Sequence, residues 1–420
     1  MLAAVVAAGA LAFARPAEAG DFVPAARLQT GVTFIRSPAG DADDWFVSAN
    51  PELGYFFEVG RIQGSLRYGL AASVNTFLPN SLSNRLAYAM SFDVSERTRV
   101  LFGVEGMQAA IGNYILVRPT ADTQIGGIPR LNTQLGTITV TEGVQHDITE
   151  VMRFTQTASA SWVTSLDPDI KANNYLVANT FGWDRSFKFD AIGVELGAQY
   201  AKTIFPPLRA DIVTAQLGPR WSHDVNRWLT TNVTAQGAVA ASPDPGTEAQ
   251  ITPAGRASAL VFDGEGSSIE ASYTVGYQPN LLTGTLLQSH QGQLRGSIPV
   301  SVPNNLVLSA AAGFLHAKNV DLRTQGANDN AFDAVLHDLD LTWLPMDFFA
   351  VSARYQFVGQ TSGDGAAPTP AIVRHAALLS FGYTGQRSRA EREKVPTKFP
   401  QRVDRGDKSG GGSSSRSDRP

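Results

Sequence analysis

Side chains that could act as nucleophiles, general bases or metal ligands are few in this sequence. It contains no cysteine and six histidines, and neither an HExxH zinc pattern nor a GxSxG nucleophile pattern occurs. His146 followed by Asp147 is the one pair that resembles a base with its orienting carboxylate. No histidines or carboxylates repeat at ligand spacing. We therefore expect no enzymatic activity, no metal site and no cofactor.

The remaining ionisable and amide side chains follow a period of two. In HDLDLTW, residues 337–343, Asp338 and Asp340 alternate with Leu339 and Leu341. Successive side chains of a β-strand point to opposite faces, so this spacing places the two acids on one face and the two leucines on the other. The same alternation recurs from Leu53–Val59 to the final segment VRHAALLSFGYT. The sequence predicts strands with one apolar and one polar face.

The polar faces carry both signs of charge in nearly equal numbers, together with many amides. A ring of one sign would favour selection of anions or cations, whereas amides that donate and accept hydrogen bonds suit neutral polar solutes or carbohydrate. Any one of these side chains could also do no more than solvate the wall. The residues expected to line a water-filled interior are Arg61, Arg67, Arg99, Glu105, Glu195, Gln216, Arg220, Asn232, Gln236, Glu270, Gln293, Arg295, Asp338, Asp340, Arg354, Gln356 and Arg374.

Large aromatic residues lie on the apolar faces close to the expected turns. Amphipathic rings at strand ends suit the boundary between a bilayer and water, where one edge of the ring is wet. The predicted membrane-interface aromatics are Phe92, Trp162, Trp221, Trp228, Trp343 and Phe348.

Composition excludes an α-helical membrane protein and favours a barrel. Beyond the N-terminus the 420-residue chain has no run of about 18 apolar residues. Charged residues make up 17%, below the roughly 25% usual in soluble domains. Sandwiches, propellers and solenoids are soluble alternatives, but the apolar aromatics at strand ends and the polar opposite face favour a transmembrane barrel, and no propeller repeat of about 40–50 residues is present.

The two ends of the chain differ from the middle. Residues 1–19 join an apolar run to the site Ala17-Glu18-Ala19, which predicts a secretory signal peptide, with a short buried helix as the alternative. Residues 386–420 lack apolar periodicity and carry a net charge of 10 − 5 = +5, which predicts a disordered basic tail. Between them we expect a short periplasmic segment (20–27) and a barrel (28–385).

We count about seventeen alternating segments and expect 16–18 strands, because bacterial barrels have even strand numbers. The missing strand is expected in Leu135–Val140, within a connection from Ala109 to Glu150 that could plug the pore or lie outside it.

Together, the signal, the two-faced strands, the aromatics at strand ends and the closing segment ALLSFGYT resemble those of bacterial outer-membrane β-barrel proteins. That resemblance covers most of the chain and implies an all-β, transmembrane antiparallel barrel in the outer membrane of a Gram-negative bacterium. It departs at the end, where a tail follows the final aromatic residues instead of an aromatic C-terminus.

The resemblance implies a water-filled pore. We expect polysaccharide export across the outer membrane, with a carbohydrate polymer as the solute. Three alternatives remain: a general diffusion porin for small polar solutes, a barrel enzyme of lipase or protease type, and a structural barrel that recruits a periplasmic partner. Expected partners are outer-membrane lipid, the barrel-assembly machinery and, through the basic tail, an export or peptidoglycan partner; no nucleic acid is expected.

Overall fold

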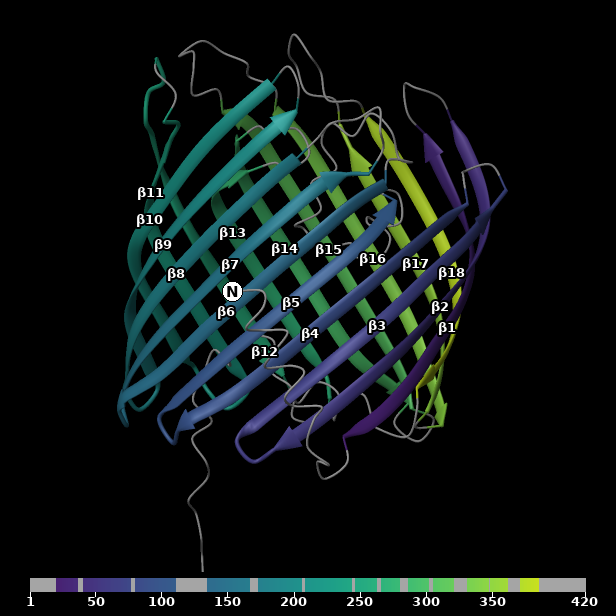
Figure 1. Cartoon of the computed structure of the whole chain (residues 1–420), viewed down its shortest axis with the longest axis horizontal. Helices are drawn as coiled ribbons and strands as arrows, with labels where there is room; N and C mark the ends of the chain where they lie inside the picture. Colours follow the sequence, from purple (N-terminus) through teal and green to yellow (C-terminus); the bar gives the residue numbers. More distant parts are fainter. Residues whose placement is uncertain are drawn as a thin grey trace, which may run out of the picture.

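The computed structural model of the 420-residue chain describes residues 20–36, 41–76, 80–110, 134–166, 173–205, 208–243, 246–262, 266–279, 286–301, 305–320, 331–346, 348–361 and 371–384. These residues form one sheet of 18 strands (Figure 1). Every strand pairs antiparallel with its neighbour in sequence, and the pairing of the first strand with the last closes the sheet into a barrel. Within the described ranges, no helix is long and apolar enough to cross a membrane.

The strands span 12 to 18 residues, more than the roughly 9–11 residues that a tilted strand needs to cross a membrane. Their bounds are β1 Asp21–Arg36, β2 Ala42–Val59, β3 Ile62–Asn75, β4 Ser81–Ser95, β5 Thr98–Ala110, β6 Gln134–Thr149, β7 Met152–Ser165, β8 Asn173–Ser186, β9 Asp190–Phe205, β10 Leu208–Asp224, β11 Leu229–Ala241, β12 Gln250–Phe262, β13 Ser268–Pro279, β14 Leu286–Ser301, β15 Leu306–Val320, β16 Ala331–Met346, β17 Phe349–Gln360 and β18 Ile372–Thr384.

The two ends of the barrel differ in the length of their connections. At one end, the short-turn end, residues 60–61, 96–97 and 150–151 join successive strands. The opposite end, the long-loop end, includes the connections 111–133 and 321–330. β1 begins and β18 ends at the short-turn end, the end that faces the periplasm in outer-membrane barrels.

Alternation gives the barrel wall an apolar outside and a largely polar inside. Leu53, Leu294 and Leu339 are about half exposed, at 50%, 51% and 46%, and belong to the outward set of their strands. Their register partners share the same face, as Leu339 opposite Tyr355 shows. A closed sheet with a continuous apolar exterior requires lipid around it. The chain therefore forms a closed antiparallel β-barrel of the kind that spans a membrane.

The predicted fold class and an even strand count at the upper end of the range are confirmed. The strand suspected at Leu135–Val140 is also present, as the first half of β6. The connection is therefore shorter than the predicted Ala109–Glu150, because β6 occupies residues 134–149. The remaining segment that could plug the pore, 111–133, lies outside the described residues.

Two further boundaries differ from expectation. β1 begins at Asp21 and pairs with both β2 and β18, so residues 21–27 are barrel wall and not a separate periplasmic segment. The sequence Leu344-Pro345-Met346, between the aromatic residues Trp343 and Phe348, predicts a turn, but β16 continues through all three residues; a register shift between Trp343 and Met346 accommodates the proline near the strand end. The expected signal peptide (1–19) and tail (386–420) lie outside the described residues.

Candidate functional site

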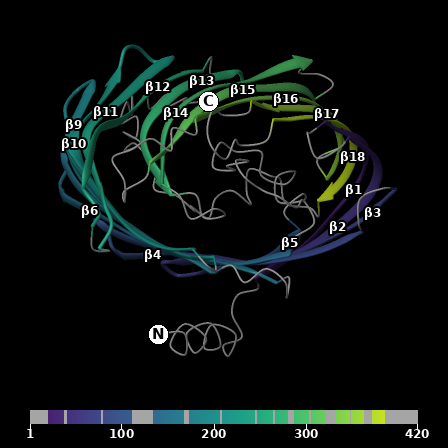
Figure 2. The ribbon, with the colours of Figure 1, turned by 90° about the horizontal axis from the view of Figure 1, so that it is seen from above.

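The candidate site is the inner wall of the barrel, whose strands are seen from above in Figure 2. A cavity of about 1090 Å³ is lined by residues of β2 through β13. Its wall is made by the inward-facing half of each strand, because side chains alternate between lipid and lumen. Any solute that crosses the barrel along this wall meets these side chains.

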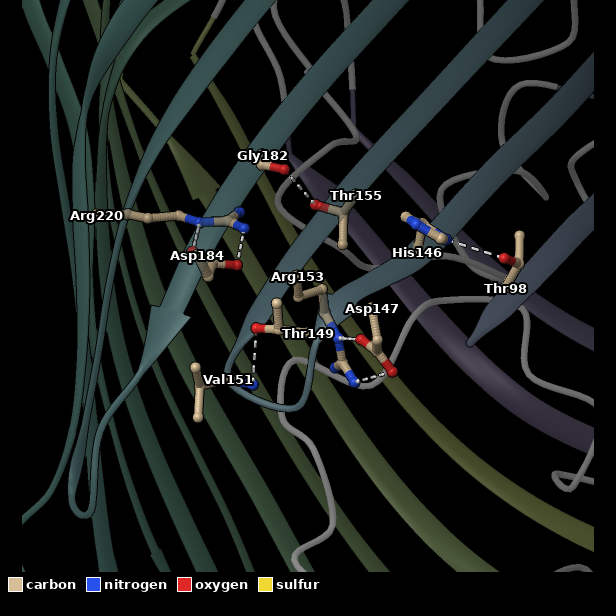
Figure 3. Close-up of polar contacts among 10 residues, drawn as sticks. All are labelled: Thr98, His146, Asp147, Thr149, Val151, Arg153, Thr155, Gly182, Asp184 and Arg220. Atoms are coloured by element: carbon tan, nitrogen blue, oxygen red, sulfur yellow. Dashed lines mark hydrogen bonds and ion pairs between the residues drawn. The ribbon is translucent and has the colours of Figure 1, made fainter. Parts of the chain in front are cut away.

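Arg220 on β10 is the centre of a cluster of ion pairs on one side of the cavity (Figure 3). Its guanidinium forms a two-pronged pair with the carboxylate of Asp184 on β8 and places Nη1 3.3 Å from Oε2 of Glu195 on β9. Gln236 on β11 donates a hydrogen bond from Nε2 to Oε1 of Glu195 at 3.0 Å. Two carboxylates, one guanidinium and one amide thus join four neighbouring strands.

Glycine lets the Arg220 side chain lie along the wall. A Cβ atom at Gly182 would stand 2.5 Å from Nη2 of Arg220 and 2.6 Å from Oγ1 of Thr155. Thr155 also reaches the Gly182 carbonyl at 3.5 Å. A side chain at position 182 would therefore push the guanidinium toward the lumen.

Four further arginines of the lumen pair with acids on adjacent strands in the same way. Each pair neutralises charge close to the wall and leaves no ring of one sign within the described residues. The pairs are Arg85–Glu105 at 3.1 Å, Arg99–Asp93 at 2.7 Å, Arg153–Asp147 at 2.6 Å and Arg354–Asp338, with Nε of Arg354 2.8 Å from Oδ1.

Hydroxyl groups cover the wall between these pairs. The inward residues of β6, β7 and β8 that line the cavity include Thr139, Thr141, Thr155, Thr157, Ser159 and Thr180. The Thr139 and Ser161 hydroxyl oxygens are 3.0 Å apart. Hydroxyls donate and accept hydrogen bonds, so this surface can solvate uncharged polar solutes.

The structure places the expected pore-lining residues as follows. Arg61 lies in the turn between β2 and β3 at the mouth of the barrel, and the other sixteen lie on inward faces. Their role in transport stays a prediction. Those that line the cavity are Arg67, Glu105, Glu195, Gln216, Arg220, Asn232 and Gln236; Arg99, Glu270, Gln293, Arg295, Asp338, Asp340, Arg354, Gln356 and Arg374 lie elsewhere on the inner wall.

The expected interface aromatics all lie on the outside or in turns and are partly exposed: Phe92, Trp162, Trp221, Trp228, Trp343 and Phe348. Trp162 stacks on Tyr175, with ring centroids 6.4 Å apart, toward the long-loop end of β7 and β8. Phe348 meets Tyr383 edge-on at 6.0 Å at the short-turn end. Their contact with a bilayer boundary stays a prediction.

His146 and Asp147 do not form a catalytic pair. They lie on β6, and not in a loop as expected, so their side chains point to opposite sides of the wall. His146 is 2.9 Å from the Thr98 hydroxyl on the outer face, while Asp147 pairs with Arg153 on the inner face. Within the described ranges, no three histidine or acidic side chains gather closely enough to hold a metal ion.

Two features of the lumen are not predicted from the sequence. Asp184, Asp147 and Arg153 were not among the expected lumen residues, although their alternation with apolar neighbours could have identified them. Several inward positions are apolar and buried, including Phe46, Phe56 and Leu378. These break the rule that lumen-facing residues are polar, and no periodic signal marks them.

Solved structures of other proteins resemble this chain in architecture, at low sequence identity. The chain is similar to OccK2 (OpdF) of Pseudomonas aeruginosa, with 12% identity over 87% of this chain and 98% of that chain and a TM-score of 0.49. A structure of OccK2 in complex with glucuronate gives a TM-score of 0.47 at the same identity and coverage.

The alcaligin outer-membrane receptor FauA of Bordetella pertussis is 12% identical over 88% of this chain and 77% of that chain, with a TM-score of 0.42. No protein-family model and no curated protein matches the sequence. The architecture described above therefore rests on the strand pairing of this chain itself.

Proposed function

We propose that this outer-membrane barrel is a passive pore for small polar solutes. The observation that carries the proposal is the arrangement of the cavity wall, where arginines and acids pair with one another and hydroxyls fill the surface between them. Barrels of 16 to 18 strands are wide enough to hold an aqueous channel.

Internal pairing argues against strong selection by charge. Arg220 already interacts with Asp184 and Glu195, and Arg85 interacts with Glu105. A charged solute would have to compete with these partners, whereas an uncharged solute can use the hydroxyls and amides without separating a pair. Small neutral polyols and sugars should pass at least as well as ions of similar size.

Polysaccharide export, the function first expected from the amide-rich lumen, has less in its favour. The lumen features that suit a carbohydrate polymer suit small polar solutes equally well. The feature that pointed to a dedicated export machine was the basic segment 386–420, which lies outside the described residues. Diffusion of small solutes requires no such partner.

Proteoliposome swelling tests the proposal with the purified full-length protein. We expect swelling rates to fall with solute size from a pentose to a hexose to a disaccharide, and to differ little between a neutral sugar and its uronic acid. Rates equal to those of empty liposomes for every sugar would contradict a diffusion pore. Deletion of the gene separates the alternatives: loss of surface polysaccharide with unchanged uptake of small solutes would favour export.

A further inference from the structure

Four of the six histidines lie on one sector of the outer wall. His290, His316, His337 and His375 belong to β14, β15, β16 and β18, and each shares the outward face with exposed apolar residues of its own strand, as His337 does with Leu339. We call these four residues the histidine band. The other two histidines, His146 and His223, also face outward but lie near the short-turn end.

Ring contacts join the band into two groups, one on β13 to β15 and one on β16 to β18. The Tyr273 hydroxyl is 2.7 Å from Nδ1 of His290, and the rings of His290 and His316 are 6.2 Å apart. On the neighbouring strands, Phe357 lies between two histidines, with its ring 5.8 Å from His337 and 5.0 Å from His375. The Tyr355 hydroxyl is 2.7 Å from Nδ1 of His375.

The band lies near the bilayer boundary at the long-loop end of the barrel. His316 stands 316 − 306 = 10 positions from the short-turn end of β15, and Trp162 stands 162 − 152 = 10 positions from that of β7. At roughly 3.3 Å per residue and a tilt near 40°, ten positions rise about 25 Å, which is the height of the apolar band of such barrels. On β14 to β18, histidines thus occupy the level that Trp162 and Tyr175 occupy on β7 and β8.

Histidine gives this level a property that tryptophan and tyrosine lack. An ordinary imidazole has a pKa of about 6.5 and becomes cationic below it. Lipid headgroups at this height carry phosphate, and a cationic side chain near an anionic bilayer surface is attracted to it. We propose that the histidine band binds the phosphate groups of outer-leaflet lipids and does so more strongly as the pH falls below neutrality.

The charged groups around the band leave it net cationic when the imidazoles are protonated. Asp333 on β16 is 2.7 Å from Nδ1 of His316 and offsets one charge. Lys318 on β15 lies two residues from His316 and is exposed. On the far side, β1 places Phe34 opposite His375 and Arg36 opposite Val373, and Arg36 pairs with Asp41 and Asp43.

The test uses the full-length protein in vesicles of phosphatidylcholine alone and of phosphatidylcholine mixed with phosphatidylglycerol, at about pH 5.5 and about pH 7.5. The preference of the barrel for spin-labelled phosphatidylglycerol over spin-labelled phosphatidylcholine is measured by electron paramagnetic resonance. We expect a several-fold higher preference at the lower pH. An equal preference at both pH values would overturn the proposal.

Two variants with the same kind of substitution locate the effect. The quadruple variant H290Q/H316Q/H337Q/H375Q should lose the pH-dependent preference, whereas H146Q/H223Q, at the other end of the barrel, should retain it. Heat-modifiable gel mobility shows whether each variant is folded, and H316Q/H337Q serves in place of the quadruple variant if that chain does not fold. Retention of the full pH effect in a folded band variant would overturn the proposal.

Discussion

At the scale of single residues, the energetic cost of a substitution depends on whether the side chain faces lipid or the lumen, and on its depth in the membrane. Leu341 and Val351 both face lipid on adjacent strands. Leu341 lies 346 − 341 = 5 positions from the short-turn end of β16, near the middle of the apolar band, whereas Val351 lies two positions from the start of β17, opposite Trp343. The same substitution should therefore have different costs at the two sites, because the penalty for a charge depends on depth.

Leu341→Arg should lower the free energy of unfolding by about 2–4 kcal/mol, while Val351→Arg should lower it by about 0–1 kcal/mol. Equilibrium unfolding by guanidinium in lipid vesicles, followed by tryptophan fluorescence, measures both. Equal costs for the two variants would place the membrane boundary elsewhere on the barrel.

Gly182 is a lumen residue whose missing side chain matters. Gly182→Ala should move the Arg220 guanidinium away from the wall, because a Cβ atom there would stand 2.5 Å from Nη2. A less completely paired arginine should make the pore more selective for anions. The reversal potential in a salt gradient measures this change.

Gly69→Ala is the matched control for that experiment. Gly69 also lines the cavity, but its nearest neighbours would be 3.9 Å from an added Cβ atom, an ordinary contact. Its reversal potential should stay at the wild-type value. An equal shift of the reversal potential in both variants would show that the change does not arise from Arg220.

At the scale of strands, periodicity predicts most of the wall but not its exceptions. Strands with clean alternation, such as β3 and β16, were found because apolar and polar residues occupy opposite faces. β6 was largely missed because its outward face includes Glu142 and His146 beside Ile138 and Val140, so neither face is uniformly apolar. A strand that carries charge on both faces has no period-two contrast to detect.

The same limit applies to the site. Alternation assigned side chains to the lumen, but it carries no information on which residues lie opposite one another. The Arg220–Asp184–Glu195 cluster depends on the register of β8, β9 and β10, and the histidine band depends on that of β14 to β18. Register follows from closure of the whole sheet, which no single segment encodes.

β1 supports a prediction about closure. Residues Asp21 to Arg27 pair with β2, and the last three of them also pair with β18. A chain that begins at Leu28 should therefore close less stably than one that begins at Gly20, because it leaves backbone groups of β18 unpaired in the membrane. Heat-modifiable gel mobility at increasing temperature compares the two.

The chain that begins at Leu28 should lose its compact mobility at a lower temperature. Identical transition temperatures would mean that residues 21–27 do not contribute to the wall. The chain from Gly20 is the matched control, since it differs only in the paired segment.

At the scale of the whole molecule, the fold and the lumen support a single account. Eighteen antiparallel strands close a sheet whose outside is largely apolar, and several inward arginines pair with acids on neighbouring strands. A barrel of this width with a polar inner wall can hold a channel filled with water and small polar solutes.

Single-channel recording of the purified full-length protein in a planar bilayer tests this account most directly. It predicts stable, stepwise increases in current, with a reversal potential close to zero in a potassium chloride gradient because inward arginines pair with acids along the wall. A barrel that is folded by heat-modifiable mobility yet conducts no current would contradict it.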